Sequence, residues 1–189
     1  DYLERPESSG RCSAVLDMRI VDEEGCALPA GQRGELQVRG TSVIRGYWNR
    51  PDANAETFDG PWLRTGDVAY FDELGFVFIV DRIKDMVLRG GENVYCVEVE
   101  TVLFEHAAVR DCAVIGLPHD KLGEEVAAVL VAAEGFGSDH DAEILAFLKT
   151  RLASFKVPTK VFWHHEELPR NATGKVLKKD LRDEYAASK

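Results

Sequence analysis

The 189-residue sequence predicts an α+β protein: a small antiparallel, β-barrel-like subdomain followed by a compact α+β domain with helices packed on a small sheet. Three observations lead to this prediction. Short strand-like segments with turn residues between them fill residues 1–81. After residue 82, apolar residues at helical spacing alternate with apolar strand-like runs. Between the two patterns, charge concentrates at residues 81–85, where we place the boundary.

The first part is predicted to consist of strands joined by turns, with one short helix. The strand-like segments are residues 13–21, 34–39, 63–71 and 76–81. Turns rich in Asp, Glu and Gly occupy residues 22–25 and 72–75. Pro51 fits the first turn of a helix over residues 52–57, because the start of a helix does not need the N–H group that proline lacks. We assign residues 1–81 to one β-rich subdomain.

The second part is predicted to place helices on a sheet. Apolar side chains recur at helical spacing in residues 99–104, 144–152 and 177–185. Strand-like runs occupy residues 109–117, 125–132 and 161–165. We therefore expect an α+β domain that extends from residue 86 to residue 189.

Composition and charge exclude several functional classes. The formal net charge of −10 argues against nonspecific nucleic-acid binding, which needs clustered positive charge. Residues 149–182 nevertheless carry nine Lys or Arg against three Asp or Glu, which suits either a small anionic ligand or a solvated helical surface. No apolar run approaches the roughly 20 residues of a membrane-spanning helix. We therefore expect a cytoplasmic protein with no integral membrane segment and no secretion signal.

Cysteine and histidine usage indicates neither a disulfide framework nor a metal centre. The cysteines lie far apart in the sequence, at Cys12, Cys26, Cys96 and Cys112. Their spacing is not that of a zinc site, so we expect reduced thiols. His164 and His165 are adjacent on a predicted strand, so their side chains point to opposite faces and cannot easily share one metal ion.

The segment from Trp62 to Asp67 places a carboxylate directly after a glycine, at the predicted end of a strand or in the turn that follows it. Asp67 can accept hydrogen bonds from both hydroxyls of a ribose, as carboxylates in nucleotide sites often do. Thr-Gly-Asp is also an ordinary turn sequence, and the segment taken alone favours that interpretation.

Residues 81–85 place four charged side chains beside an apolar strand. Such a segment is commonly a hydrated connector between domains. A functional interpretation adds two roles: Arg82 binds ribose or phosphate oxygens, and Lys84 is the pivot about which the second domain turns.

A glycine pair follows at Gly90 and Gly91, directly before Glu92. Glycine permits a positive φ angle or the close approach of a ligand to the backbone. The segment fits neither the phosphate loop of nucleotide triphosphatases nor the dinucleotide fingerprint, so a tight turn is the simplest interpretation.

Residues 168–175 form a polar loop ahead of the helix predicted around Leu181. Thr173 is a candidate N-cap, which would put Lys175 in the first turn, where free N–H groups and the helix dipole favour an anion. Because a lysine there opposes the dipole, Lys175 is either a functional residue or a solvated surface lysine.

Taken together and in this order, these segments resemble the carboxy-terminal motifs of the adenylate-forming superfamily, which includes acyl-CoA synthetases, luciferases and peptide-synthetase adenylation domains. The resemblance extends over nearly the whole chain, through residues 34–36, 45–47, 50–51, 65–67, 81–100 and 169–175. Residues 81–95 look most like fatty acyl-CoA ligases and related aryl-acid ligases. Two departures are Asp81, where many members have glycine, and Cys96, where many have proline.

The resemblance implies a two-step reaction and a role for each matching residue. ATP and a carboxylic acid would give an acyl-adenylate and pyrophosphate, and coenzyme A would then displace AMP to form a thioester. Asp67 would hold the ribose hydroxyls, Arg82 would assist at the nucleotide, and Lys175 would reach the carboxylate and the phosphate. Lys84 would be the hinge, within residues 82–85, of a mobile domain over residues 86–189. Gly90, Gly91 and Glu92 would border the tunnel for the pantetheine arm.

The phosphate loop and most of the acyl pocket of this family lie upstream of these motifs, and no segment here resembles them. We therefore expect residues 1–81 to be the last subdomain of a large amino-terminal domain, whose missing portion is a partner, and the 189-residue chain alone to be inactive. Mg²⁺ would serve the full-length enzyme, with no ligand identified in this chain. Two alternatives stay open: a non-catalytic nucleotide-binding or regulatory module, and an adenylation domain that loads a carrier protein.

The loop around Lys175 also looks like the loop that is acetylated in bacterial acyl-CoA synthetases. The resemblance therefore implies a protein acetyltransferase as a further partner, acting on Lys175. Acetylation would remove the positive charge on which the first step depends.

Overall fold

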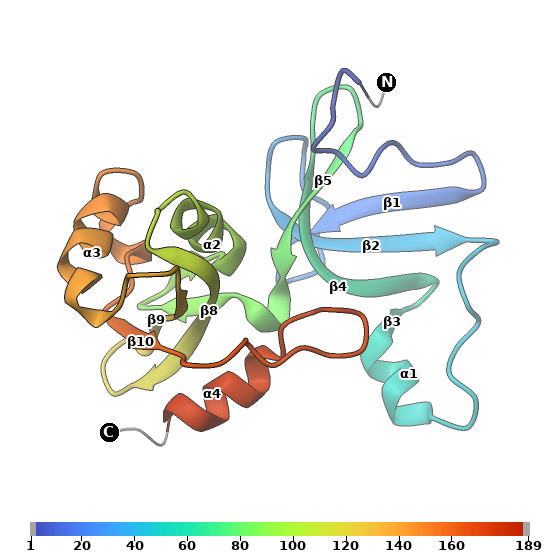
Figure 1. The fold of residues 1–189 in the computed structure, drawn as a ribbon. Coiled ribbons are helices and arrows are strands. Elements are labelled where there is room, and N and C mark those ends of the chain that lie inside the picture. The colour runs from blue at the N-terminus through green and yellow to red at the C-terminus, as the bar shows by residue number, and fades with distance from the viewer. Residues whose placement is uncertain (1–2, 187–189) are drawn as a thin grey trace. The chain divides into compact units, whose positions relative to one another are not determined.

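Two separately folded units make up the chain in a computed structural model, which describes residues 3–186. Unit 1 is Asp1–Lys84 and unit 2 is Asp85–Lys189. Figure 1 labels the helices and strands of both. The predicted fold class is confirmed: an antiparallel β unit precedes an α+β unit.

Unit 1 is built on an antiparallel sheet of five strands in the order β1-β2-β4-β3, with β5 also paired to β4. The strands are β1 (Leu16–Val21), β2 (Gly34–Gly40), β3 (Phe58–Asp59), β4 (Trp62–Phe71) and β5 (Val77–Arg82). The predicted helix is present as α1 (Pro51–Thr57), with proline at its start. Ile20, Leu36, Ala69 and Val77 form the buried core.

Unit 2 surrounds a second five-stranded sheet with three helices. Its strands are β6 (Val87–Arg89), β7 (Glu92–Val94), β8 (Val109–His119), β9 (Gly123–Ala132) and β10 (Lys160–Trp163). Its helices are α2 (Cys96–Phe104), α3 (Asp141–Lys149) and α4 (Lys178–Ala186). Three short 3-10 helices lie at Ile83–Asp85, Ser138–His140 and Ser154–Lys156. All strand pairs are antiparallel except β9 and β10, which are parallel.

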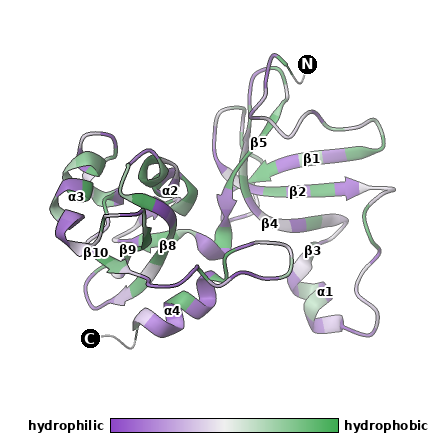
Figure 2. Cartoon of the chain, viewed as in Figure 1, coloured by the Kyte–Doolittle hydropathy of each residue, from purple (hydrophilic) through white to green (hydrophobic). Residues whose placement is uncertain are grey.

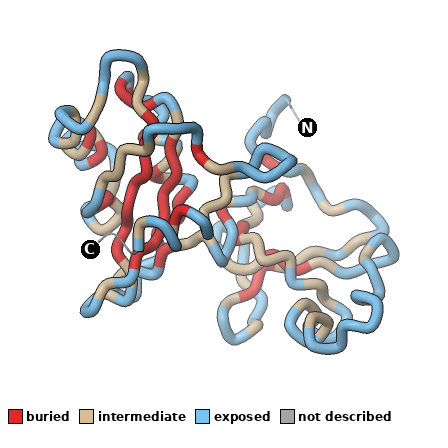
Figure 3. Tube along the Cα trace, turned by 60° about the horizontal axis from the view of Figure 1, so that its bottom comes forward, coloured by how far each residue is buried: buried red, intermediate tan, exposed pale blue. Residues whose placement is uncertain are grey.

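The core of unit 2 lies on both faces of β8 and β9, where buried residues concentrate (Figure 3). One layer contains Val114, Val126 and Leu130 with residues of α2 and α3. The other contains Ile115, Ala127 and Val129 with Leu168 and with Leu181 of α4. Because successive residues of a strand point to opposite faces, these layers cover opposite sides of the sheet. A strand buried on both faces reads as a continuous apolar run, as β9 does.

Helix α4 shows how one apolar stripe suffices to hold a polar helix on this sheet. Most of its side chains are hydrophilic (Figure 2), but Leu181 is fully buried. The aromatic rings of Tyr185 and Phe162 lie 4.5 Å apart, centroid to centroid. The Tyr185 hydroxyl also lies 2.9 Å from Nδ1 of His164.

Two local predictions are wrong. The loop before α4 does not use Thr173 as a helix cap, because the helix begins only at Lys178 and the Thr173 hydroxyl donates instead to Asn171. Lys175 is therefore outside the first helical turn. The strand predicted to include His164 and His165 is shorter, because β10 ends at Trp163, although the His164 N–H still donates to the Leu130 carbonyl at 2.8 Å.

Candidate functional site

Asp67 and Arg82 are direct cross-strand neighbours in unit 1, on β4 and β5. Arg82 Nε lies 3.5 Å from Asp67 Oδ1, and both side chains keep contact with solvent, at 46% and 23% exposure. Two polar groups predicted to bind one nucleotide are thus brought together. An exposed carboxylate beside a guanidinium can accept from hydroxyls while the guanidinium donates to anionic oxygens.

The position of Asp67 within β4 corrects the expectation of a strand end or turn. Gly66 has a φ of +73°, a turn-like backbone conformation, and the pairing of β4 with β5 shifts register just beyond it. The Thr65 hydroxyl accepts from the Asp67 N–H at 3.1 Å and donates to the Leu36 carbonyl at 2.8 Å. The glycine is therefore an irregularity inside a strand, and it holds the carboxylate on a rigid sheet.

The charged segment 81–85 is not uniformly hydrated, contrary to the simplest interpretation of its sequence. Asp81 is 7% exposed, and its Oδ1 accepts from the Arg82 N–H at 2.8 Å. Arg82 and Lys84 are exposed, and Lys84 lies in the 3-10 helix at the last residue of unit 1. Burying Asp81 in this way fixes the backbone from which Arg82 extends.

Gly90 and Gly91 form the two-residue loop of the β6–β7 hairpin, between the paired residues Arg89 and Glu92. Their φ angles are +61° and +88°, a combination that side chains disfavour and that two-residue hairpins require. The Gly90 N–H donates to the Leu122 carbonyl at 2.8 Å. The tip is exposed and carries no side chain until Glu92, so a ligand can approach the backbone closely there.

Lys175 lies in an exposed loop that leads into α4. Its N–H donates to Asn171 Oδ1 at 2.9 Å, and an isolated β bridge pairs Arg170 with Val176. The lysine side chain is thus presented to solvent from an ordered backbone. An ammonium group held this way can meet a developing negative charge on a substrate.

The hairpin tip and the lysine loop are anchored in different core layers of unit 2. Val87 and Val94 of the hairpin pack in the layer with α2 and α3. Leu168 and Val176, which flank the lysine loop, pack in the layer with α4. The two candidate segments are therefore held from opposite faces of one sheet.

Other polar and reactive groups do not form a competing site. Burial, reinforced by Glu100 and Asp111, raises the pKa of the Cys112 thiol far above its ordinary value and makes it a poor nucleophile. All four cysteines are free. The described part of the chain holds no group of three or more His, Cys, Asp or Glu side chains arranged for a metal ion.

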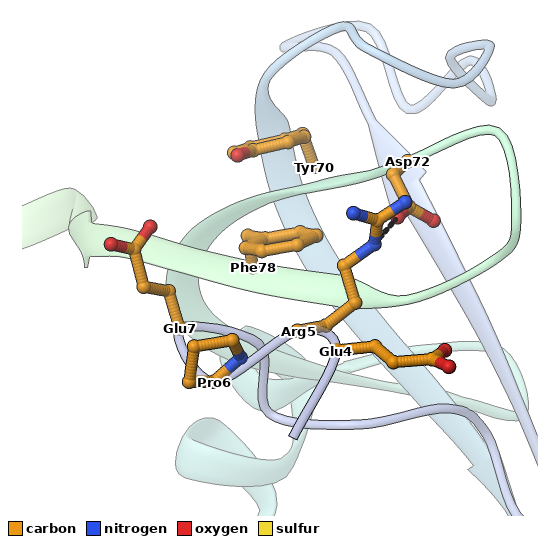
Figure 4. Close-up of a pocket in the computed structure, with 7 residues that line it drawn as sticks. All are labelled: Glu4, Arg5, Pro6, Glu7, Tyr70, Asp72 and Phe78. Atoms are coloured by element: carbon orange, nitrogen blue, oxygen red, sulfur yellow. Dashed lines mark ion pairs between the residues drawn. The ribbon is translucent and has the colours of Figure 1, made fainter. Parts of the chain in front are cut away.

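A hollow of about 470 Å³ in unit 1 has no predicted site residue in its lining (Figure 4). The stacked rings of Tyr70 and Phe78, 5.0 Å apart, line it together with the ion pair of Arg5 and Asp72. Between residues 3 and 186, no helix is both long and apolar enough to cross a membrane.

Sequence reasoning missed the residues that organise the lysine loop, namely Arg170, Asn171 and Asp111. Asn171 had a readable signal, because Asn-Ala-Thr-Gly is a typical turn sequence in which the asparagine side chain bonds to the backbone that follows. Asp111 had none, since it lies 59 residues from Arg170.

Known proteins resemble the chain over its whole length. Residues 98–175 match the family model described as the AMP-binding enzyme C-terminal domain. The long-chain-fatty-acid–CoA ligase FadD13 of Mycobacterium tuberculosis is 41% identical over 100% of this chain, and a feruloyl-CoA synthase of Amycolatopsis sp is 43% identical over 96%. The chain spans 37% of the length of either relative. The ATP-bound crystal structure of MatB from Rhodopseudomonas palustris superposes with a TM-score of 0.89 at 38% identity, over 96% of this chain and 36% of that one.

Proposed function

Since this chain belongs to the adenylate-forming superfamily, to whose carboxy-terminal part it corresponds, we propose that it is the carboxy-terminal part of an ATP-dependent acyl-CoA ligase. In the first step a carboxylate oxygen of the substrate attacks the α-phosphorus of ATP, which releases pyrophosphate and leaves an acyl-adenylate. In the second, the thiol sulfur of coenzyme A attacks the acyl carbonyl carbon and AMP leaves. The substrate class that fits the relatives is a fatty or an aryl carboxylic acid.

Asp67 and Arg82 are the proposed nucleotide-binding pair. The Asp67 carboxylate accepts hydrogen bonds from the ribose hydroxyls, and the Arg82 guanidinium donates to ribose or phosphate oxygens. Their placement on adjacent strands, with Arg82 Nε 3.5 Å from Asp67 Oδ1, supports this role because both groups can contact one ligand. AMP and ATP share the ribose and the α-phosphate, so the pair serves both steps.

Lys175 is the proposed catalytic residue of the first step. Its ammonium group contacts the substrate carboxylate and the α-phosphate, where negative charge builds up between two anions that would otherwise repel each other. A flexible side chain with three donors suits a contact that must follow moving oxygens. The exposed side chain and the fixed backbone of Lys175 support the role.

The hairpin tip at Gly90, Gly91 and Glu92 is the proposed border of the pantetheine tunnel in the second step. With no Cβ at two successive positions, the thiol arm can pass along the backbone. The observation that carries the two-step proposal is the anchoring of this hairpin and of the Lys175 loop from opposite faces of one sheet. A rotation of residues 86–189 about Lys84 would exchange one segment for the other at the substrate.

The remaining part of the enzyme is the proposed partner of this chain, because the chain spans 37% of its relatives. The upstream part would supply the acyl pocket and the phosphate loop, and the 189 residues alone would be inactive. Mg²⁺ is a further proposed cofactor of the full-length enzyme. We also propose Lys175 as a target of a protein acetyltransferase, which mass spectrometry of the enzyme from acetyl-CoA-rich cells would test.

The experiment that tests the function is an assay of the full-length enzyme with ATP and a panel of fatty and aryl acids. We expect acid-dependent pyrophosphate release and, with coenzyme A present, acyl-CoA formation. If the acyl group is transferred to the phosphopantetheine arm of a carrier protein and not to free coenzyme A, the protein is instead an adenylation domain that loads a carrier protein. Nucleotide binding without pyrophosphate release from any acid would instead indicate a regulatory module.

A further inference from the structure

The peptide group between Gly174 and Lys175 is held from both sides. Its carbonyl oxygen accepts from Arg170 Nη1 at 2.8 Å, and its N–H, which belongs to Lys175, donates to Asn171 Oδ1 at 2.9 Å. The Lys175 carbonyl accepts from the Asn171 N–H at 2.9 Å. Both backbone polar groups of Lys175 and the Gly174 carbonyl therefore have partners within the loop, although the loop is exposed.

Asn171 accepts three hydrogen bonds within the loop through one side-chain oxygen. Its Oδ1 accepts from the N–H groups of Thr173 and Lys175, at 3.0 and 2.9 Å, and from the Thr173 hydroxyl at 2.8 Å. Gly174, with a φ of +82°, allows the chain to turn back between them. At the neck of the loop the Leu177 N–H donates to the Pro169 carbonyl at 2.7 Å. These bonds close residues 169–177 into a tight, internally hydrogen-bonded turn.

Arg170 ties this turn to the sheet of unit 2. While Nη1 binds the Gly174 carbonyl, Nη2 lies 2.7 Å from Asp111 Oδ2 on β8. Asp111 is itself fixed, because its Oδ1 accepts from the Cys112 N–H at 2.9 Å and its side chain is 22% exposed. One guanidinium thus bridges a rigid strand and the peptide that carries Lys175. A planar guanidinium holds its donors in fixed directions for such a bridge, whereas the donors of an ammonium group rotate about one atom.

We propose that Arg170, backed by Asp111, is a positioning residue for the Lys175 ammonium group in the adenylation step. This inference rests on the proposed function, and neither residue is assigned to contact the substrate. The lysine side chain is long and has several rotatable bonds. Motion of its backbone would add to the rotation of these bonds and would widen the range of positions that the ammonium group takes. Misplacing a reacting group by about 1 Å can lower a rate about a hundredfold.

Two variants of the full-length enzyme test the proposal. Asp111→Asn keeps an oxygen for the Cys112 N–H but removes the charge that faces Arg170. Arg170→Lys keeps the charge but removes the planar fork whose two nitrogens bind Gly174 and Asp111. Glu105→Gln is the matched control, because Glu105 forms an exposed ion pair with Arg151 in the same unit, with a nitrogen–oxygen distance of 3.5 Å.

Each half-reaction is measured separately, with thioester formation started from supplied acyl-adenylate. We expect Asp111→Asn and Arg170→Lys to slow adenylation by between about tenfold and a hundredfold and to leave thioester formation within about twofold. In a Lys175→Ala background, Asp111→Asn should cause no further loss, since its effect acts through Lys175. Equal losses in both half-reactions, or losses that add in the double variant, would overturn the proposal.

Hydrogen exchange separates this inference from the proposed function. In Asp111→Asn, the amides of residues 171–177 should exchange faster while those of β8 and β9 stay unchanged. Unchanged exchange at residues 171–177 would refute the anchoring, whatever the enzyme does. Accelerated exchange with intact adenylation in Lys175→Ala would instead refute the catalytic role of Lys175.

Discussion

Lys178 and Glu100 form an ion pair in unit 2, with a distance of 2.7 Å between Lys178 Nζ and Glu100 Oε1 and side-chain exposures of 13% and 15%. The same carboxylate oxygen accepts from the Val114 N–H at 2.7 Å. The pair therefore links the first turn of α4 to α2 and β8.

Neutralising Glu100 should destabilise unit 2 strongly. Glu100→Gln would remove the negative charge of a carboxylate that Lys178 Nζ and the Val114 N–H share and that has little contact with solvent, at a cost of about 3 kcal/mol. The same change directly after α2, Glu105→Gln, disrupts only an exposed pair and should cost within about 0.5 kcal/mol. Urea unfolding followed by Trp163 fluorescence, with Trp48 and Trp62 replaced by Phe, would measure both. An equal decrease in the free energy of unfolding in both variants would contradict the idea that low solvent exposure makes the Glu100 pair more important.

The stability of unit 2 should fall in acid partly because of Glu125. Burial opposes ionisation of this side chain, but bonds from Lys160 Nζ at 2.9 Å and the Thr159 hydroxyl at 2.7 Å outweigh it and lower its pKa. A carboxyl whose pKa is lower in the folded than in the unfolded state stabilises the fold above the unfolded pKa of about 4.3, and this contribution is lost as the pH falls through the folded value. Urea unfolding measured from neutral pH to about pH 3 should therefore show a smaller decrease in the free energy of unfolding for Glu125→Gln than for the unmodified chain. The same pH dependence in both would contradict the assignment.

Replacing Lys175 by Ala in the full-length enzyme should lower acyl-adenylate formation by about a hundredfold or more, because one charged donor to the reacting phosphate is lost. Thioester formation from supplied acyl-adenylate should be spared, since the hairpin serves that step. Lys179→Ala, an exposed lysine of α4, is the control. Pyrophosphate release and thioester formation report the two steps, and an equal loss in both would eliminate the two-segment assignment.

Gly91→Ala should impair the second half-reaction more than its effect on stability explains. The φ of Gly91 is +88°, and an added Cβ would meet no atom within 4 Å, so the backbone strain alone costs about 1 kcal/mol. Gly135 has a φ of +83° and equally open surroundings, which makes Gly135→Ala a matched control. Both variants should unfold at similar urea concentrations, while only Gly91→Ala slows thioester formation. Normal thioester formation in Gly91→Ala would contradict the proposal that the hairpin borders the pantetheine tunnel.

Asp67→Asn should weaken the use of ATP. Losing a charged acceptor for the ribose hydroxyls corresponds to a rise of about tenfold in the KM for ATP. Asp17 faces Arg39 across β1 and β2 in the same cross-strand arrangement, with a distance of 2.8 Å, so Asp17→Asn controls for loss of the ion pair alone. Steady-state kinetics with varied ATP would measure the change, and a similar rise in both variants would contradict a ribose contact.

The long elements and the family could be predicted because their signals are local and redundant. The apolar run of β9 indicates a buried strand, and the helical spacing around Leu148 indicates a helix. The ordered motifs indicated the superfamily. Strands β3, β6 and β7 have two or three residues each and are held by pairing with distant segments, so they left no pattern. Burial of Asp81 and the reach of Arg170 to Asp111 likewise depend on tertiary contacts.

The parallel pairing of β10 with β9 has a consequence for how the protein is made. Residues 160–163 close an edge formed by residues 127–130, and α3 lies between them in the chain. Strand β9 is apolar on both faces, and β8 covers only one of its edges. During synthesis on a ribosome, residues 127–130 therefore have no partner on that edge until more than thirty further residues have been added. In that interval the nascent chain presents an unpaired apolar strand edge, which is prone to pair with other chains.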